Sequence, residues 1–473
     1  MDNEISNLSA RSLASAIRSR KISAREALDA HLAQIDAVNP AINAIVTLDR
    51  EAAFAAAGAA DALTMSGAEL PPLHGVPMTH KDTHNTKGLR TTQGSVVFKD
   101  NVPDFDDLIV QRLKGAGVVT TGKSNVPEFA AGSHTFNEVF GTTTNPYATS
   151  LSAGGSSGGA AAAIAARIQA IGDGSDMGGS LRIPASFCNI AGLRPSAGVV
   201  PLLPSQDAFA WLGRVGPMAR EISDIALMMS AIAGTHPHSP ITNPVPPARF
   251  TEPLERDLTG LRIGYSPDFG IGVPVEPEVL RTLEKQLGVF EQLGARVEQA
   301  APDLREADMV FGNVRAMEYA LKLGDIVREH GSLVKPEVRW NVEKGWALTS
   351  RDWVETTLAR TRLEMQVQVF FDQYDVFVSP SAQALPFDAS FRFPTLTTGS
   401  EPENYLDWMR SACLISATGL PALSVPAGFS DSGLPVGMQL VMNHGTDFEL
   451  LQVGYAFEQA TGFARQAPAL LGS

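Results

Sequence analysis

The chain has 473 residues, of which 37 are lysine or arginine and 51 are aspartate or glutamate, so its formal charge is −14. Hydrophobic residues make up 44% of the sequence and charged residues 19%, a balance typical of a folded globular protein and not of a disordered one. The acidic excess argues against nonspecific nucleic-acid binding, which needs clustered lysine and arginine to displace counterions.

The cysteine content and the apolar runs exclude two further classes. Cys188 and Cys413 are too few for a disulfide-rich secreted scaffold, and neither lies in a C-x-x-C pair suited to a metal. No uninterrupted run of 18 apolar residues occurs, so we expect no membrane-spanning helix. Residues 1–21 lack a basic segment followed by an apolar one, so we expect no signal peptide and a cytoplasmic protein.

Residues 1–65 are predicted to form an N-terminal helical segment. Ser23 and Glu26 have the spacing of a capping box, and the apolar residues that follow them lie along one helix face. A strand-like run at 41–48 and an alanine-rich helix at about 51–63 complete this segment.

From residue 74 onward, short apolar runs alternate with helical stretches. We predict a helix near 108–114, a β-branched strand at 118–121 and an alanine-rich helix at 159–168. This alternation predicts an α/β fold, in which a mostly buried sheet carries helices on its faces.

The later part of the chain returns to the same alternation. Residues 235–253 are rich in proline and predict a surface connection, and residues 303–373 are predicted to be mainly helical. Strand character resumes after residue 375. We therefore favour a single domain over residues 1–473, in which 235–375 forms a peripheral cap, and we keep a separate domain at 235–375 as the alternative.

Residues 117–124, GVVTTGKS, fit the Walker A pattern letter for letter. A phosphate-binding loop needs a strand before the first glycine and flexible backbone between the two glycines. Here a helix precedes Gly117, and the intervening residues are β-branched and favour a strand. This context disfavours a nucleotide site at Lys123, which stays a competing hypothesis.

Two glycine-rich segments flank the predicted helix at 159–168. The first, GGSSGG at 154–159, satisfies the G-x-S-x-G pattern of an α/β-hydrolase nucleophile, although any such run satisfies it twice. An α/β-hydrolase with Ser156 as nucleophile and His444 as base is therefore a competing hypothesis. Two flexible turns around one compact unit also predict close approach of the backbone to a bound group.

The second glycine-rich segment, 172–180, ends in Ser180. Consecutive glycines before a serine leave backbone N–H groups free to converge, as an oxyanion hole requires. A helix is expected near Pro184, and its positive end would add to such a site. A plain surface turn explains the same spacing equally well.

Lys81 follows an apolar strand-like run, where lysine is usually solvated, so it matters only if it is buried. Two histidine pairs have loose metal-ligand spacing. They are His80 with His84, and His236 with His238. No predicted helix supports the first pair and a proline splits the second, so we expect all four to be surface residues.

Taken together, these segments resemble the amidase signature family. The resemblance rests on motifs that occur in family order over most of the chain. They are GVPMTHKD at 75–82, GKSN at 122–125, GTTTNP at 141–146, the run 154–195, GLPALSVP at 419–426 and GLPVGMQ at 433–439. The resemblance implies an amide hydrolase with a central twisted mixed β-sheet that helices cover on both faces.

The resemblance also implies the site residues. Ser180 would be the nucleophile, Ser156 the bridging serine after a cis peptide bond, and Lys81 the base. The oxyanion donors would be the backbone amides of Met177, Gly178, Gly179 and Ser180. Asp176 and Arg182 would brace this turn, and Ala130 would line the substrate pocket. Asn189 and Arg194 depart from the usual Gly and Lys, which puts only local packing in doubt.

The implied chemistry sets a physical condition on Lys81. Lysine acts as a base only when neutral, so its pKa must fall from about 10.4, which burial achieves. We expect Asp82 to point away from it, as neighbours on a strand do. Ser156 would pass a proton from Ser180 to Lys81 and return it to the leaving nitrogen. An acyl-enzyme and then water complete the reaction, without a metal or organic cofactor.

The expected function is hydrolysis of a small-molecule amide to acid plus ammonia or amine, with neither nucleic acid nor a membrane as partner. A homodimer is compatible with the sequence. The alternative within the family is the A subunit of a glutamyl-tRNA(Gln) amidotransferase, although residues 405–418 look more like stand-alone amidases. Residues 129–136 and 303–373 are rich in Phe, Met, Trp and Ala, so aryl or aliphatic amides, carbamates and esters are candidate substrates.

Overall fold

A computed structural model describes residues 2–396 and 404–472. Its centre is a mixed sheet of eight strands in the order β12-β11-β13-β15-β14-β9-β10-β8. The strands are β8 (Ile171–Asp176), β9 (Ala191–Arg194), β10 (Arg214–Ala219), β11 (Arg262–Tyr265), β12 (Arg296–Gln299), β13 (Val376–Pro380), β14 (Ala422–Phe429) and β15 (Pro435–Val441). β11 runs parallel to β12 and β13, and the remaining pairs are antiparallel.

A second sheet of three strands lies on the N-terminal side. Its order is β1 (Ile45–Leu48), β3 (Val119–Ser124) and β2 (Pro77–Lys81), with β2 parallel and β1 antiparallel to β3. Two short hairpins complete the strands. They are β4 (Phe136–Asn137) with β5 (Gly141–Thr142), and β6 (Thr144–Asn145) with β7 (Ala148–Ser152).

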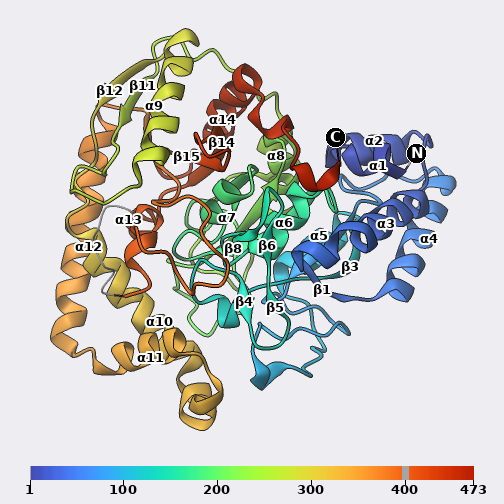
Figure 1. Cartoon of the computed structure of the whole chain (residues 1–473), viewed down its shortest axis with the longest axis horizontal. Helices are drawn as coiled ribbons and strands as arrows, with labels where there is room; N and C mark the ends of the chain where they lie inside the picture. The colour runs from blue at the N-terminus through green and yellow to red at the C-terminus, as the bar shows by residue number, and fades with distance from the viewer. Residues whose placement is uncertain (1, 397–403, 473) are drawn as a thin grey trace.

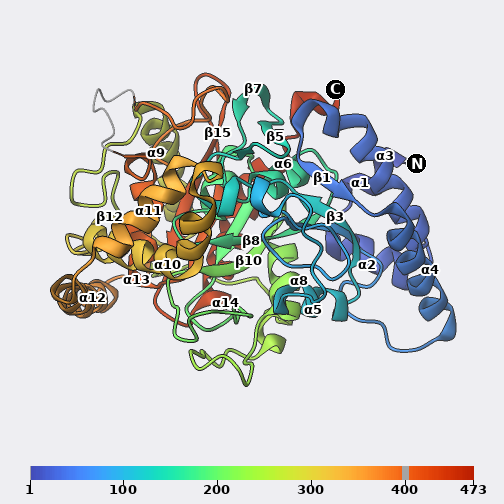
Figure 2. The same cartoon turned by 90° about the horizontal axis from the view of Figure 1, so that it is seen from below.

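Helices surround the sheets on both sides. Those before residue 190 are α1 (Asp2–Asn7), α2 (Ala10–Arg18), α3 (Ala24–Ile42), α4 (Arg50–Ser66), α5 (Leu108–Gly115), α6 (Gly158–Ala165) and α7 (Arg182–Phe187). The later ones are α8 (Ile222–Ile232), α9 (Pro277–Gln292), α10 (Ala307–His330), α11 (Pro336–Ala347), α12 (Ser350–Phe371), α13 (Arg410–Thr418) and α14 (Asp447–Thr461). The first four gather at one end of the molecule and α10 to α12 at the other (Figure 1). Strands β8 and β10 run between α6 on one side and α8 and α14 on the other (Figure 2).

This architecture confirms the predicted α/β fold with a mixed sheet between helices. The capping box is present, since Ser23 N–H donates to Glu26 Oε2 at 2.7 Å and Glu26 N–H to Ser23 Oγ at 3.1 Å. The strand expected at 41–48 is shorter, because α3 continues to Ile42. None of the helices within the described ranges is long and apolar enough to cross a bilayer.

One glycine-rich segment differs from the prediction, whereas the Walker A segment forms the strand that was predicted for it. Residues 172–176 form strand β8, because β10 pairs with them along their whole length. Gly174 is required there, since a Cβ would lie 2.7 Å from Ser157 Oγ. The Walker A glycine, Gly122, lies inside β3, where a Cβ would meet the carbonyl oxygen of Thr47 on β1. This segment is a strand, not a phosphate-binding loop.

The expected peripheral cap at 235–375 contains more than peripheral helices. Strands β11 and β12 belong to the central sheet, and α9 packs beside them (Figure 1). Only α10, α11 and α12 extend away from the sheet. The sequence between β11 and β13 therefore adds both to the core and to the outer rim.

Candidate active site

Lys81 is the last residue of β2, and its side chain is fully buried. The ammonium nitrogen Nζ donates to three serine hydroxyls, those of Ser156 and Ser157 at 2.8 Å and of Ser175 at 2.9 Å. Burial lowers the pKa of Lys81 to about 7, against the opposing charges of Asp176 and Asp173. A large fraction of this lysine is therefore neutral near pH 7, and a neutral amine can accept a proton.

The two serines beside Lys81 lie where the chain turns into α6. A cis peptide bond joins Gly155 to Ser156, as the family resemblance implies, and both Ser156 and Ser157 are fully buried. The backbone N–H of Ser157 donates to the carbonyl oxygen of Ser180 at 3.2 Å. This bond ties the serine turn to the turn that carries Ser180.

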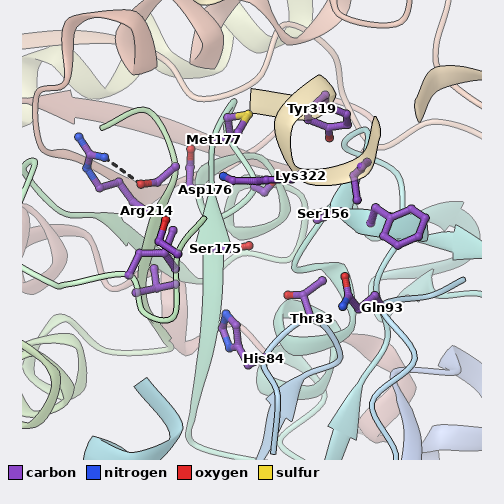
Figure 3. A pocket seen from close by; sticks show the side chains of 18 of the residues that line it. Thr83, His84, Gln93, Ser156, Ser175, Asp176, Met177, Arg214, Tyr319 and Lys322 are labelled. Atoms are coloured by element: carbon purple, nitrogen blue, oxygen red, sulfur yellow. Dashed lines mark hydrogen bonds between the residues drawn. The ribbon is translucent and has the colours of Figure 1, made fainter. Parts of the chain in front are cut away.

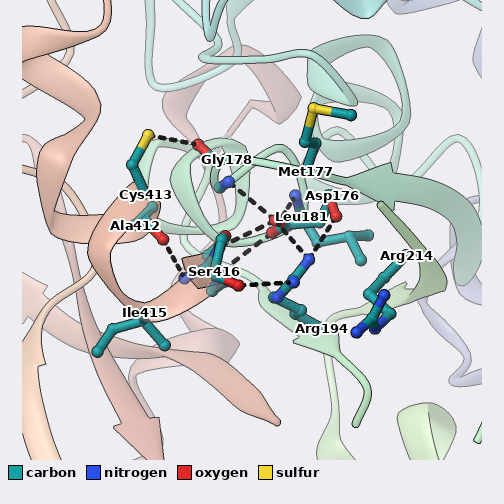
Figure 4. Close-up of polar contacts among 12 residues, drawn as sticks. Asp176, Met177, Gly178, Leu181, Arg194, Arg214, Ala412, Cys413, Ile415 and Ser416 are labelled. Atoms are coloured by element: carbon teal, nitrogen blue, oxygen red, sulfur yellow. Dashed lines mark hydrogen bonds and ion pairs between the residues drawn. The ribbon is translucent and has the colours of Figure 1, made fainter. Parts of the chain in front are cut away.

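Ser180 lies between β8 and α7, and its turn is held by one carboxylate. Asp176 accepts hydrogen bonds from the backbone N–H groups of Gly179 at 2.8 Å and Leu181 at 3.1 Å, and from Arg182 Nη2 at 2.9 Å (Figure 4). Burial acts to raise the pKa of Asp176, but Arg182 and Arg194 outweigh it and hold the pKa well below its usual range. The turn is therefore built around a charged, fully buried carboxylate.

This geometry changes two expectations. The N–H of Gly179 already donates to Asp176, so the candidate oxyanion donors reduce to the amides of Met177, Gly178 and Ser180. Arg194 does more than local packing, because its Nη1 donates to the backbone oxygen of Asp176 at 2.5 Å (Figure 4). Both differences involve Asp176, whose carboxylate accepts from Gly179 and whose backbone oxygen accepts from Arg194.

A cavity of about 460 Å³ opens onto these serines (Figure 3). Ser156, Ser175 and Ser180 line it together with Ala130, as expected for the substrate pocket. Its apolar wall comes from Phe98, Phe129, Met177, Leu202, Leu323 and Ile326. Its polar wall includes His84, Asn85, Gln93, Arg214, Tyr319 and Lys322. The cavity is large enough for a small organic molecule and offers mostly apolar contact near the serines.

Three residues near Lys81 were not predicted as part of the site. Asp173 Oδ1 accepts the backbone N–H of Lys81 at 2.7 Å, and Oδ2 lies 2.5 Å from His80 Nδ1. His84 Nδ1 lies 3.3 Å from Asp173 Oδ1. The prediction of surface histidines is therefore wrong for His80 and His84, which are buried, whereas His238 is exposed.

The charge state of this cluster follows from its contacts. Burial acts to raise the pKa of Asp173, but His80 and His84 outweigh it and hold the pKa well below its usual range. Burial lowers the pKa of His80. An ionised carboxylate only accepts, so His80 carries a proton on Nδ1 that it donates to Asp173, while its Nε2 lies 3.0 Å from Thr120 Oγ1.

The two remaining ionisable predictions concern Asp82 and Lys123. Asp82 points away from Lys81, as expected, and accepts from the Thr92 hydroxyl at 2.5 Å and N–H at 3.1 Å. Lys123 is buried in β3, where Nζ donates to Thr86 Oγ1 at 2.7 Å and to the carbonyl oxygen of His84. Buried in this way it cannot reach a nucleotide phosphate, so the nucleotide-binding hypothesis is wrong.

The α/β-hydrolase hypothesis is also wrong. His444 Nε2 lies 3.1 Å from Glu364 on α12, outside the cavity that Ser156 lines. Ser156 instead contacts Lys81. Within residues 2–396 and 404–472, no group of three or more His, Cys, Asp or Glu side chains is arranged to hold a metal ion.

Comparison with known proteins identifies one family. The Amidase family model matches residues 26–451. An acylamidase of Rhodococcus erythropolis is 35% identical over 468 residues, which are 98% of this chain and 97% of that protein. The A subunit of the glutamyl-tRNA(Gln) amidotransferase from Moorella thermoacetica is 35% identical over 491 residues, which are 99% of each chain.

Solved structures of similar fold include a bacterial aryl acylamidase of the amidase signature enzymes. It has a TM-score of 0.92 and 27% identity, and the match covers 98% of this chain and 99% of that one. The 6-aminohexanoate cyclic dimer hydrolase complexed with substrate has a TM-score of 0.86 and 26% identity, with the same coverage of both chains.

Proposed function

Since the chain belongs to the Amidase family and is a hydrolase of amide C–N bonds, we propose that it works as a stand-alone amidase through a Ser180 acyl-enzyme. The observation that carries this proposal is the buried Lys81 amine, whose pKa burial lowers to about 7 and which contacts serine hydroxyls at the wall of a cavity that Ser180 also lines. A base of this kind is what a weakly nucleophilic serine needs.

The first half-reaction forms the acyl-enzyme. Neutral Lys81 takes the proton of the Ser156 hydroxyl while Ser156 takes that of Ser180, and Ser180 Oγ attacks the amide carbonyl carbon. The negative charge that develops on the carbonyl oxygen is stabilised by the amides of Met177, Gly178 and Ser180, which the braced turn keeps in position. Hydrogen bonds between catalytic side chains are often longer in a free enzyme and shorten when the substrate binds.

Reversal of the proton path completes the acyl-enzyme, and entry of water then opens the second half-reaction. The Lys81 ammonium returns its proton through Ser156 to the leaving nitrogen, the C–N bond breaks and the amine departs. Water then enters, Lys81 and Ser156 remove its proton, and the hydroxide equivalent attacks the acyl carbon. Collapse of this second intermediate releases the acid and restores the Ser180 hydroxyl.

The wall of the cavity supports a preference for apolar acyl or aryl groups. Phe98, Phe129, Leu323 and Ile326 would cover one side of a bound molecule. The similarity to an acylamidase and an aryl acylamidase points in the same direction. We therefore propose anilides and aliphatic amides as the first substrates to assay.

Covalent labelling of the nucleophile, in which the serine oxygen displaces fluoride from phosphorus, tests its identity directly. The wild-type protein mixed with a fluorophosphonate should gain one adduct by mass spectrometry, and peptide mapping should assign it to Ser180. Ser180→Ala should lose both the adduct and turnover of p-nitroacetanilide, whereas Ser186→Ala, a buried serine outside the cavity, should retain both. An adduct on Ser156, or one that persists in Ser180→Ala, would contradict the proposal.

A second candidate function is that of the A subunit in a glutamyl-tRNA(Gln) amidotransferase. The identity of 35% to such a protein over nearly the whole chain supports it. Glutaminase activity of the isolated chain should then be low and should rise when the B and C subunits of an amidotransferase are added. If the isolated chain turns over anilides well and glutamine poorly under both conditions, the stand-alone function is favoured.

A further inference from the structure

Helix α12 has an apolar face that points to solvent. Four side chains on this face are 50% to 63% exposed. They are Val354, Leu358, Met365 and Val369. The opposite face, which includes Leu363 and Phe370, is buried against the rest of the protein. Both views place α12 at the outer edge of the molecule, with no other element beyond it (Figures 1 and 2).

The spacing of this face is that of a helix–helix contact. Val354, Leu358, Thr361 and Met365 are separated by four, three and four residues, the alternation that keeps side chains on one seam between packed helices. The seam covers about three turns, roughly 16 Å of helix. Scattered single apolar residues on a surface are ordinary, but a regular stripe on one helix is typical of an interaction site.

We propose that this seam is the interface of a homodimer, in which α12 pairs antiparallel with α12 of a second copy. A two-fold axis between Leu358 and Thr361 sets Val354 opposite Met365 of the second copy, and Leu358 opposite Thr361 of the second copy. The same pairs recur on the other side of the axis. One surface patch is thus complementary to itself, as a two-fold interface requires.

The charges beside the seam favour the same pairing. Glu355 and Arg362 occupy equivalent positions next to it, and the antiparallel arrangement brings Glu355 of each copy near Arg362 of the other. Arg362 is already held at this side of the helix, because its Nε donates to Glu306 at 2.7 Å. In the proposed dimer, two opposite-charge pairs therefore flank the single interface between the two helices.

A membrane surface is the less suitable occupant. Helices that lie on membranes carry mostly lysine and arginine beside their apolar face, whereas this seam has Glu355 and Glu364 as well as arginines. The formal charge of −14 also opposes approach to an anionic bilayer. The seam lies apart from the cavity, since no residue of α12 lines it, so this inference is independent of the proposed chemistry.

Sedimentation velocity on the full chain from about 1 to 100 μM tests the proposal. A short helix pair lies at the low end of interface sizes, so we expect a weak, reversible dimer whose monomer and dimer coexist within this concentration range. Leu358→Glu should raise Kd at least about tenfold. Leu321→Glu, which changes a similarly exposed leucine on α10, should leave Kd within about twofold. Circular dichroism and anilide turnover should be unchanged in both variants.

A charge exchange tests the antiparallel register. Glu355→Arg and Arg362→Glu should each weaken the dimer, and the double variant should recover most of the loss. A chain that is monomeric at 100 μM, or a dimer indifferent to Leu358→Glu, would overturn the proposal. So would failure of the double variant to recover. Sedimentation with phosphatidylcholine–phosphatidylglycerol vesicles that depends on Leu358, in a chain that stays monomeric, would assign the seam to a membrane instead.

Discussion

Two lysines on neighbouring strands of the small sheet are equally buried and yet differ in their surroundings. Lys81 ends β2, Lys123 lies in β3, and the register sets Lys123 beside His80. The ammonium of Lys81 meets three serine hydroxyls at the cavity. That of Lys123 meets the hydroxyl of Thr86 and the backbone carbonyl of His84, and Lys123 itself does not line the cavity. Only the first arrangement connects the lysine to hydroxyls that line the cavity.

The electrostatics of the two sites show that a lowered pKa does not by itself identify a base. Burial lowers the pKa of Lys81 to about 7 and that of Lys123 to about 8. The carboxylates of Asp82, Asp173 and Asp107 act against burial and raise the pKa of Lys123, with Asp82 contributing most. Burial thus acts on both in the same way, and the contacts of Nζ decide which lysine can take part in catalysis and which is structural.

Exchanging each lysine for methionine should separate these roles most clearly. Lys81→Met removes the base and should lower kcat for p-nitroacetanilide by about 10³- to 10⁴-fold, the range of general-base catalysis. Lys123→Met should leave kcat within about tenfold, because Lys123 contacts no serine of the cavity. Equal loss of kcat in the two variants would mean that both act on catalysis through the shared sheet.

Stability should respond in the opposite order. Lys123→Met leaves the Thr86 hydroxyl and the His84 carbonyl without their donor and removes the positive charge that favours ionised Asp82, so it should cost about 3–5 kcal/mol of unfolding free energy. Lys81→Met leaves only hydroxyl groups without a donor and should cost about 1–3 kcal/mol. Urea unfolding followed by circular dichroism measures both. A larger loss of unfolding free energy in Lys81→Met than in Lys123→Met would show that Lys81 is charged, not neutral, in the resting protein.

The difference between the two lysines was only partly predictable from the sequence. The family resemblance predicted that Lys81, Ser156 and Ser180 lie in one site, because each of them belongs to a run that matches a family motif. Local signals such as the capping box at Ser23 also held. These features depend on residues near one another in the sequence, or on a pattern that extends over the whole chain.

The Asp173 cluster was missed because it depends on pairing between distant segments. Residues 172–176 contain two glycines and were predicted as a turn, and only pairing with β10 makes them a strand. Once they are a strand, its two-residue period puts Asp173 and Ser175 on the face that meets Lys81. The absence of a predicted helix around His80 and His84 suggested a surface position, and the carboxylate of Asp173, which the prediction did not place there, makes their burial favourable.

Removing the charge of Asp173 should shift the pH dependence. Only neutral Lys81 accepts a proton, so kcat/KM should rise with pH and reach half its maximum near the Lys81 pKa of about 7. The negative charge of Asp173 raises that pKa. Asp173→Asn should therefore lower it and move the midpoint down by about 1 unit. Asp107→Asn, which acts on Lys123, should leave the midpoint within about 0.2 units.

The opposite outcome for Asp173→Asn is equally informative. An upward shift, or none, would show that the charge of Asp173 is fully screened from Lys81 by the two imidazoles. Thermal unfolding of each variant distinguishes a change in electrostatics from a loss of structure. A midpoint that moves equally in Asp107→Asn would remove the distinction between the two lysines.

The smallest expected effect addresses which hydroxyl carries the proton. Lys81 Nζ lies at 2.8 Å from Ser156 and Ser157 and at 2.9 Å from Ser175, so distance alone does not choose among them. Ser175→Ala should remove one hydrogen bond of about 1 kcal/mol and lower kcat about 3- to 10-fold, and Ser157→Ala should act similarly. Ser156→Ala should instead approach the loss in Lys81→Met. If Ser175→Ala produced that loss, the proton path would run through Ser175, and the bridging role assigned to Ser156 would be wrong.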